Sequence, residues 1–237
     1  MAEFRFLEEV TSTNDLAKAM ARDGAPHGSA VLAWRQTAGR GRLGRAFSSP
    51  EGGVYLSVVL WPEAPPERLL HLTPVLAVAA CDAVEAVSGV RPGCKWVNDL
   101  MLDGRKLAGI LVEISGGAMI AGIGVNVNTE QAAFPPELRD AAVSLRQMTG
   151  KTFDREKLGR ELADRFAAAC LTAIRDQKAW MARYRVNCLT LGQTVETTGP
   201  EPVIGTAEDV ADDGSLLIRT EEGLRSVQSG EASLRKT

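Results

Sequence analysis

The chain has 237 residues, of which 45% are hydrophobic and 24% are charged, and its formal net charge is -3. This composition is that of a globular protein with room for a real core, and the slight negative charge argues against a general nucleic-acid or membrane binder. The start lacks a basic segment followed by an apolar one, and the longest apolar run, 69–87, is interrupted by Pro74, Asp82 and Glu85. We therefore expect a cytoplasmic protein without a signal peptide or a membrane span.

The four cysteines are widely spaced and form no CxxC pair; they are Cys81, Cys94, Cys170 and Cys188. In a chain without an export signal, such scattered thiols are expected to stay reduced. The chain has 2 histidines, so a structural zinc site is not expected. Any metal is instead expected to arrive with a nucleotide.

The first predicted elements are a strand at 4–8 and a helix that begins near Leu16 and stops at Gly24. Ser12 or Thr13 is expected to cap this helix, and Asp15 lies near its positive end. Two interpretations of the segment 11–15 stay open. It is either a helix cap only, or a cap whose hydroxyls and N–H groups also bind a polar ligand head.

The next two predicted strands, 29–34 and 54–61, enclose the run WRQTAGRGRLGRAF, in which glycines alternate with Arg40, Arg42 and Arg45. Glycines let backbone N–H groups approach an anion, and arginines add forked, permanently charged donors. The run is therefore a candidate anion-binding loop, with a triphosphate as the expected ligand. The alternative is a solvated basic loop or a nucleic-acid-binding tail. Enclosure between two buried strands favours the binding loop.

The middle of the chain begins with a buried helix in which Pro74 either follows a cap at Thr73 or produces a kink. Short strands at 95–97, 100–102, 106–114 and 119–127, joined by tight turns at 103–104 and 115–117, predict a meandering antiparallel sheet rather than a Rossmann fold.

Two further helices are expected, one capped by Asp154 and one over 178–186. From Gln193 onward, short alternating strands are separated by turn signals at 198–200, 212–214 and 222–223. This pattern predicts a small β-barrel-like module that depends on docking against its neighbour for stability.

Four sequence blocks follow one another in a specific order: STN at 12–14, GRGR at 39–42, KWVNDL at 95–100 continuing into RKLAGILVE at 105–113, and GIGVNVN at 122–128. Together they resemble the catalytic core of the biotin–protein ligases. The resemblance implies an α+β fold, with a class II aminoacyl-tRNA synthetase-like catalytic domain at 1–188. This domain has a mixed or antiparallel sheet with flanking helices, and a small C-terminal SH3-like β-barrel is expected at 189–237.

The resemblance further implies ATP-dependent attachment of biotin to a lysine of a biotin carboxyl carrier protein, through biotinyl-5′-AMP and with Mg²⁺. STN at residue 12 leaves no room for the winged helix that repressor members carry, so we expect a monofunctional ligase that does not bind DNA. Members are monomers or dimers, which leaves a homodimer open. The alternative enzyme is a lipoate or octanoate ligase of the same superfamily. A non-catalytic nucleic-acid-binding module is the alternative from another class.

The site residues are carried over from the family's motifs position by position. The resemblance assigns biotin binding to Ser12, Thr13, Asn14, Gln36, Gly39, Arg40, Gly41, Arg42, Lys106 and Gly109. It assigns ATP binding to Arg40, Arg42, Arg45, Phe47, Lys95, Asn98, Asp99, Lys106 and Asn126, with Gly122 and Gly124 leaving room for the nucleotide. Lys106 and Arg42 are the catalytic candidates, because cations beside the reacting groups stabilise charge as the anhydride forms.

Simpler interpretations of three of these residues stay open. Asp99 is the candidate Mg²⁺ ligand, but it also fits plain turn chemistry at the start of a hairpin. Lys106 also fits a hairpin surface lysine, and Phe47 fits a core aromatic as well as an adenine contact. Many family members have tryptophan at the position of Phe47 and proline at that of Val97, so the chain departs from the family pattern at both places.

Overall fold

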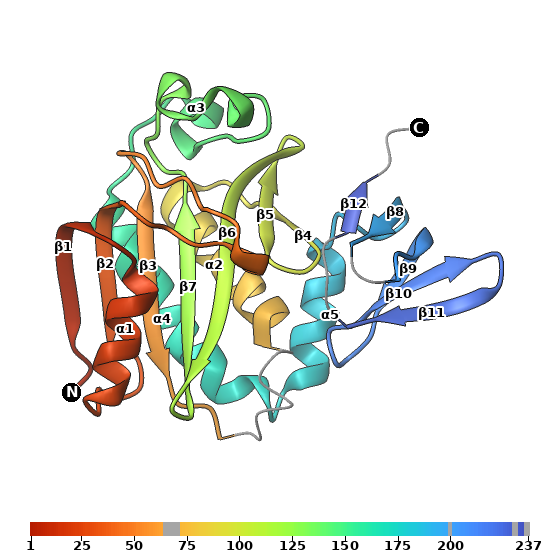
Figure 1. Cartoon of the computed structure of the whole chain (residues 1–237), viewed down its shortest axis with the longest axis horizontal. Helices are drawn as coiled ribbons and strands as arrows, with labels where there is room; N and C mark the ends of the chain where they lie inside the picture. Colours follow the sequence, from red (N-terminus) through yellow and green to blue (C-terminus); the bar gives the residue numbers. More distant parts are fainter. Residues whose placement is uncertain (64–71, 199–200, 229–231, 235–237) are drawn as a thin grey trace.

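The structure is a computed structural model that describes residues 1–63, 72–198, 201–228 and 232–234. Its main sheet has seven strands in the order β1-β2-β3-β7-β6-β5-β4 (Figure 1). β1 pairs parallel with β2 and all other neighbours are antiparallel, which confirms the predicted mixed sheet. The strands are β1 (Phe4–Val10), β2 (Ala30–Gln36), β3 (Val54–Leu60), β4 (Gly93–Lys95), β5 (Asp99–Leu102), β6 (Arg105–Ser115) and β7 (Ala118–Val125).

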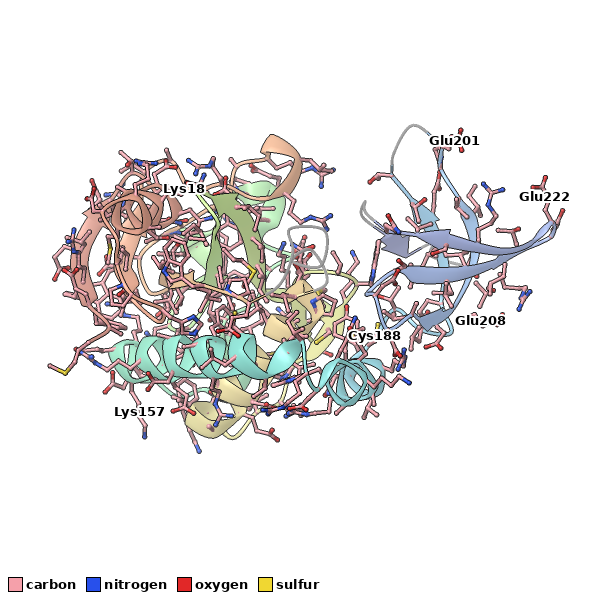
Figure 2. All side chains as sticks on the ribbon, turned by 90° about the horizontal axis from the view of Figure 1, so that it is seen from below. Lys18, Lys157, Cys188, Glu201, Glu208 and Glu222 are labelled. Atoms are coloured by element: carbon pink, nitrogen blue, oxygen red, sulfur yellow. The ribbon has the colours of Figure 1, made fainter. Side chains whose placement is uncertain are left out.

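Helices cover both faces of this sheet, and each face buries its own apolar cluster. The helix α1 (Thr13–Arg22) packs Ala17 and Met20 against Val31 and Ile120. The helices α2 (Leu72–Ser88) and α4 (Arg155–Ala173) cover the opposite face and form the larger cluster. Figure 2 shows Lys18 of α1 and Lys157 of α4 on opposite sides of the molecule. Because helices lie on both faces, β3 is buried along its whole length rather than on alternate residues.

The helix boundaries confirm the predicted cap at Asp154, place Ser12 at the predicted N-cap position of α1, and exclude a cap at Thr73. Asp154 caps α4, since its side chain accepts a hydrogen bond from the Lys157 N–H. Ser12 is the N-cap of α1, but its side chain makes no capping hydrogen bond. Pro74 lies inside the described part of α2, so of the two alternatives for this helix, a cap at Thr73 or a kink at Pro74, the cap is wrong. The predicted helix over 178–186 is α5 (Gln177–Asn187).

A second correction concerns the predicted strand at 95–97. The strand β4 ends at Lys95, and residues 96–98 form the turn into β5. Trp96 is buried and Val97 is partly buried, although neither belongs to a strand. Trp96 is 2% exposed, and its Nε1–H donates to the Gly214 carbonyl at 2.9 Å. A tertiary contact with the C-terminal part of the chain therefore accounts for the apolar character of the turn.

The C-terminal sheet has five strands in the order β11-β10-β9-β8-β12 and lies beside the main sheet (Figure 1). It confirms the predicted small β module, while Gly199 and Pro200 of the turn predicted at 198–200 lie outside the described residues. Val195 and Ile218 belong to the same apolar cluster as the main core. The strands are β8 (Thr194–Thr197), β9 (Ile204–Val210), β10 (Leu216–Thr220), β11 (Gly223–Val227) and β12 (Ala232–Leu234).

Polar bonds reinforce this junction. Arg185 of α5 lies 3.1 Å from Asp209 and 2.7 Å from Asp212, and it also donates to the Val210 carbonyl at 2.7 Å. Cys188, at the end of α5, lies at the same junction (Figure 2). All four cysteines are buried and free. In the part of the chain that the structure describes, each helix is too short or too polar to cross a bilayer.

Candidate active site

The loop of residues 37–53 crosses the face of the main sheet in front of β6 and β7 (Figure 1). It is folded upon itself, since the Gly41 N–H donates to the Arg45 carbonyl at 2.7 Å and the Phe47 N–H donates to the Gly39 carbonyl at 2.9 Å. A short 3-10 turn, η1 (Arg42–Gly44), forms its tip. Gly39 is required by space, because a Cβ there would lie 2.6 Å from the Phe47 carbonyl oxygen. The predicted binding loop therefore has a defined shape over the sheet.

Three glycines of β6 and β7 form the surface beneath this loop. A Cβ on Gly122 would overlap the side chain of Asn14, and a Cβ on Gly124 would overlap the ring of Phe47. A Cβ on Gly109 would lie 3.1 Å from Lys106 Cε and 3.2 Å from Phe47 Cε2. Without side chains here, the loop and the start of α1 approach the backbone of the sheet closely.

The loop and the sheet enclose three adjoining cavities, and Phe47 lines all of them. The larger cavity, of about 400 Å³, is lined by polar and apolar residues that include Ser48, Lys95, Asp99, Lys106, Asn126 and Phe134. The smaller cavity, of about 30 Å³, is lined by Ser12, Thr13, Asn14, Gln36, Arg40, Gly109, Gly122 and Gly124 among others. The loop cavity, of about 110 Å³, lies between them and is lined by Gly41, Arg42, Arg45, Asn98, Asp99 and Lys106 among others.

Every predicted site residue except Gly39 therefore lines one of the three cavities. The structure also separates them into groups. Asn126 and Lys95 belong to the larger cavity, whereas Gly122 and Gly124 lie in the smaller one, away from the position expected of residues that leave room for a nucleotide.

The hydrogen bonds of the smaller cavity fix the orientation of Gln36. The Thr13 N–H, at the start of α1, donates to Gln36 Oε1 at 2.8 Å, and the Thr13 hydroxyl lies 3.0 Å from the same oxygen. Because a backbone N–H only donates, this amide must present its oxygen to Thr13. Gln36 Nε2 then donates to the Ser49 hydroxyl at 3.0 Å. The first turn of α1 is thus capped by a side chain from β2 rather than by Ser12.

A carboxylate fixes the orientation of Asn14 in the same way. Asn14 Nδ2 donates to Glu113 Oε2 at 2.7 Å, and its Oδ1 accepts from the Ser57 hydroxyl at 2.5 Å. Glu113 also pairs with Lys18 Nζ at 2.6 Å. Burial raises the pKa of Glu113, but the hydrogen bonds from Lys18 and Asn14 outweigh burial and hold this pKa below its usual value. An ionised Glu113 accepts only, so Asn14 presents its oxygen to Ser57.

Cationic side chains lie where the loop cavity meets the larger one. Lys106 Nζ lies 2.7 Å from Asp99 Oδ1 and 5.9 Å from the centroid of the Phe47 ring. Arg42 donates to Asn98 Oδ1 at 3.1 Å. Lys106 and Arg42 both line the loop cavity, and both are side chains that commonly bind phosphate.

The backbone of Lys106 is held from a second side. Its N–H donates to the Ala141 carbonyl at 2.8 Å, and its carbonyl accepts from the Val143 N–H at 3.0 Å. The segment that follows β7, which contains the short turns η3 (Gln131–Ala133) and η4 (Pro136–Leu138), also supplies Phe134 and Leu138 to the larger cavity. The backbone of Lys106 is therefore fixed by this segment, while its side chain is 37% exposed.

The possible metal ligands near Lys106 fit an ion that binds together with phosphate. They do not fit a metal site built entirely from protein side chains. Within the described ranges, no three His, Cys, Asp or Glu side chains are grouped so that they could hold a metal. Asp99 lines both the larger and the loop cavity. Mg²⁺ is commonly bound by one or two carboxylates together with substrate phosphates, and Asp99 fits that pattern.

Several residues that line or support the cavities were not predicted from the sequence. Ser57 carried a usable signal, because it is a polar residue inside the otherwise apolar run VYLSVVL and is fully buried. Glu113 lies in the RKLAGILVE block but was given no role. Phe134, Leu138, Ala141 and Ala142 come from a segment without regular periodicity, so no pattern pointed to them.

The chain thus combines an α+β fold with three adjoining cavities under a glycine- and arginine-rich loop. Comparison with known families identifies it further. The biotin/lipoate A/B protein ligase family matches residues 6–130, and the biotin protein ligase C-terminal domain matches residues 190–235. The chain belongs to the biotin/lipoate A/B protein ligase family.

Named relatives agree with this assignment. The chain is similar to the bifunctional ligase/repressor of Bacillus spizizenii, with 33% identity over 97% of this chain and 73% of that protein. It is 34% identical to the biotin–[acetyl-CoA-carboxylase] ligase of Paracoccus denitrificans, over 95% of this chain and 98% of that enzyme. Its structure is similar to the Aquifex aeolicus biotin protein ligase in complex with biotin and ATP, with a TM-score of 0.87, 33% identity and full coverage of both chains. The predicted fold is confirmed by this similarity.

Proposed function

We propose that this protein attaches biotin to a lysine of a biotin carboxyl carrier domain, with ATP as the second substrate. The observation that carries the proposal is the adjacency of the cavities, since the smaller and larger ones meet at Phe47. We assign biotin to the smaller cavity and ATP to the larger one. The relatives of known name are biotin ligases, so the alternative of a lipoate or octanoate ligase is not favoured.

The smaller cavity suits the ureido ring of biotin, which has both N–H donors and a carbonyl acceptor. Ser12, Thr13, Asn14 and Gln36 supply hydroxyls, amide oxygens and amide N–H groups from one side of the cavity. Their orientations are preset by the Thr13 N–H and by Glu113. A ligand that binds among preset polar groups loses less free energy to reorganisation. Gly39, Gly41 and Gly109 are assigned to this part as backbone positions.

The larger cavity suits the nucleotide. We assign Lys95, Asp99 and Asn126 to its polar contacts and Phe47 to the base, with Arg45 reaching the phosphates from the loop cavity. Asp99, with Asn98 beside it, would hold Mg²⁺ at the phosphates. When bound, the ion would supply neutralisation of phosphate charge.

The reaction needs positioning and charge neutralisation rather than a protein nucleophile. In the first step a carboxylate oxygen of biotin attacks the α-phosphorus of ATP, and the bond to pyrophosphate breaks. Lys106 and Arg42 lie where the negative charge of both reactants would meet, so they lower the cost of bringing two anions together.

In the second step a neutral lysine amine of the carrier attacks the anhydride carbonyl. The bond to AMP breaks, an amide forms, and the amine proton leaves to the AMP phosphate or to water. The loop of residues 37–53 would keep water from the anhydride until this amine arrives.

The proposal is tested by incubating the protein with labelled biotin, ATP, Mg²⁺ and a purified carrier domain. One labelled lysine per carrier is expected, as is biotin-dependent pyrophosphate exchange. Lipoate is added as a competitor, and we expect it not to replace biotin. Absence of carrier labelling, with a carrier that another ligase modifies, would sink the proposal.

The nucleic-acid alternative has its own test. It predicts binding that falls steeply as salt rises. In the structure Arg40 pairs with Asp15, and Arg42 donates a hydrogen bond to Asn98. These two side chains therefore do not form an open basic surface for nucleic acid. We expect no binding of RNA or DNA at low salt.

A further inference from the structure

Arg40 ties the loop to two elements that are distant in sequence. Its guanidinium donates two hydrogen bonds to the carboxylate of Asp15, in the first turn of α1, each at 2.6 Å. It also lies 3.5 Å from Glu113 Oε2 on β6. Paired hydrogen bonds of this kind fix direction as well as distance. The pairing holds one wall of the smaller cavity in place, because Arg40 lines that cavity.

Arg40 and Phe47 both belong to the loop of residues 37–53, and both line the smaller cavity. A change in the position of the loop therefore changes access to this cavity. The carboxylates that hold Arg40 would in this way affect entry and release of the ligand assigned to it.

We propose that Asp15 and Glu113 are positioning residues that latch the loop over the smaller cavity by holding Arg40. The inference rests on the proposed function for its consequence, but the latch itself is a property of the loop. Neither carboxylate touches the reacting groups in this assignment. They act through Arg40, by setting how often the loop opens.

The neighbouring charges give the two carboxylates different roles in holding Arg40. Lys18 Nζ lies 2.6 Å from Glu113 and 3.9 Å from Asp15, so Glu113 is already paired with a cation. Asp15 is left as the main partner of Arg40. The hydrogen bond from Arg40 holds the pKa of Asp15 below its usual value, so the carboxylate is ionised at neutral pH.

The two positions therefore predict different effects. Asp15→Asn removes the main charge that holds Arg40 and leaves the smaller cavity's own hydrogen bonds in place. Glu113→Gln also disturbs Asn14, whose Nδ2 donates to Glu113 Oε2. We expect Asp15→Asn to change loop opening chiefly, and Glu113→Gln to raise KM for biotin as well.

Limited trypsin digestion reads loop opening without any substrate, because the loop contains Arg40, Arg42 and Arg45. Cleavage within 40–45 is followed by mass spectrometry for the unmodified chain, Asp15→Asn and Asp15→Glu. We expect cleavage of Asp15→Asn to be about two- to fivefold faster, which is the range for loss of one exposed ion pair, and Asp15→Glu to recover part of the protection. Equal cleavage rates would overturn the latch.

A matched control comes from the neighbouring strand. Glu9→Gln removes a carboxylate that pairs with Arg35 at 3.0 Å, upstream of the loop, and should leave cleavage at 40–45 unchanged. Added salt should speed cleavage of the unmodified chain, because salt screens the ion pair between Asp15 and Arg40. It should have little effect on Asp15→Asn, which lacks this ion pair. An equal salt effect on both chains would count against the latch.

Release of biotinyl-AMP gives the functional readout. With biotin and ATP but no carrier, we expect Asp15→Asn to release the adenylate several times faster than the unmodified chain. If the unmodified chain forms no adenylate, the proposed function is wrong. The latch is then still tested by the trypsin digestion, which needs no substrate. If adenylate forms and Asp15→Asn retains it equally well, the latch fails while the function stands.

Discussion

The ring of Phe47 lies directly against Gly124, where even one methyl group would overlap Cε1 of the ring. Tyr55 contacts the same ring edge-to-face, with centroids 6.4 Å apart. Phe47 is therefore one of the side chains through which the loop rests on the sheet, and the bare backbone of β7 makes room for its ring.

Gly124→Ala should lift this ring and shift the loop. We expect KM for biotin and for ATP to rise about tenfold, and the free energy of unfolding to fall by about 1–2 kcal/mol because of overpacking. Steady-state kinetics and urea unfolding measure the two effects. Ala121→Gly, on the core face of the same strand, should cost about 1 kcal/mol of stability without a change in KM. An unchanged KM for Gly124→Ala would contradict the seating of the loop by Phe47.

Lys106→Ala should slow adenylation while the fold is kept. Loss of one preorganised cation at a developing charge commonly costs about 10²–10³ in kcat, and we expect a fall of that size in biotin-dependent pyrophosphate exchange. Lys157→Ala is the matched control and should exchange at the normal rate, because Lys157 is exposed on α4, on the side of the molecule opposite Lys18 of α1 (Figure 2). Normal exchange by Lys106→Ala would remove this residue from the catalytic assignment.

Arg42→Gly should loosen retention of the adenylate, because the loop loses a phosphate donor and its bond to Asn98. Free biotinyl-AMP in the medium is expected to rise, while its rate of formation falls less. Arg42→Lys keeps the charge without the forked donor, so its leakage should be intermediate. Retention equal to that of the unmodified chain would argue that the loop does not hold the phosphate.

Acid pH should release the Asp15–Arg40 pair. Because the pKa of Asp15 is lowered in the folded protein by the hydrogen bond from Arg40, the pair stabilises the fold fully above the unfolded pKa of about 3.9 and is lost as pH falls through the folded pKa. For this half-exposed carboxylate we expect about 0.5 kcal/mol. Urea unfolding should show Asp15→Asn less stable than the unmodified chain by a constant amount from about pH 5 to 8, with the difference vanishing at lower pH. A difference that persists at acid pH would mean that charge is not the cause.

Trp96→Phe should weaken the junction between the two sheets. The substitution leaves the buried Gly214 carbonyl without its donor, which costs about 1–2 kcal/mol, and hydrogen exchange in β9 and β10 should become faster. Trp61→Phe loses a comparable bond, to the Ala25 carbonyl at 2.9 Å on the α1 side of the main sheet, and should leave that exchange unchanged. Equal exchange in both variants would mean that Trp96 does not secure the C-terminal sheet.

Local patterns predicted much of this protein, and long-range contacts account for most of what they missed. The cap at Asp154, the strands around the loop and many of the residues that line the cavities were predicted, because each depends on neighbouring residues or on a recognised motif. Residues 95–97 were predicted as a strand because Trp96 and Val97 are apolar. Trp96 is instead buried in a turn by its contact with Gly214, far along the chain. The roles of Ser57 and Glu113 depend on contacts with Asn14 that span 43 and 99 residues, and periodicity contains no information about such pairs.

The strand β6 sets the spacing between two groups of site residues. Gly109 and Leu111 line the smaller cavity and Glu113, two residues further on, accepts from Asn14 beside it, while Lys106 lies nearer the start of the strand. The pairing of β6 with β5 is irregular between Lys106 and Ala108, so the number of residues between Lys106 and Glu113 fixes how the two halves of the site are placed. Inserting a single amino acid between 109 and 113 would rotate Glu113 to the reverse side of the sheet and misalign the halves, even though every side chain named here would still be present.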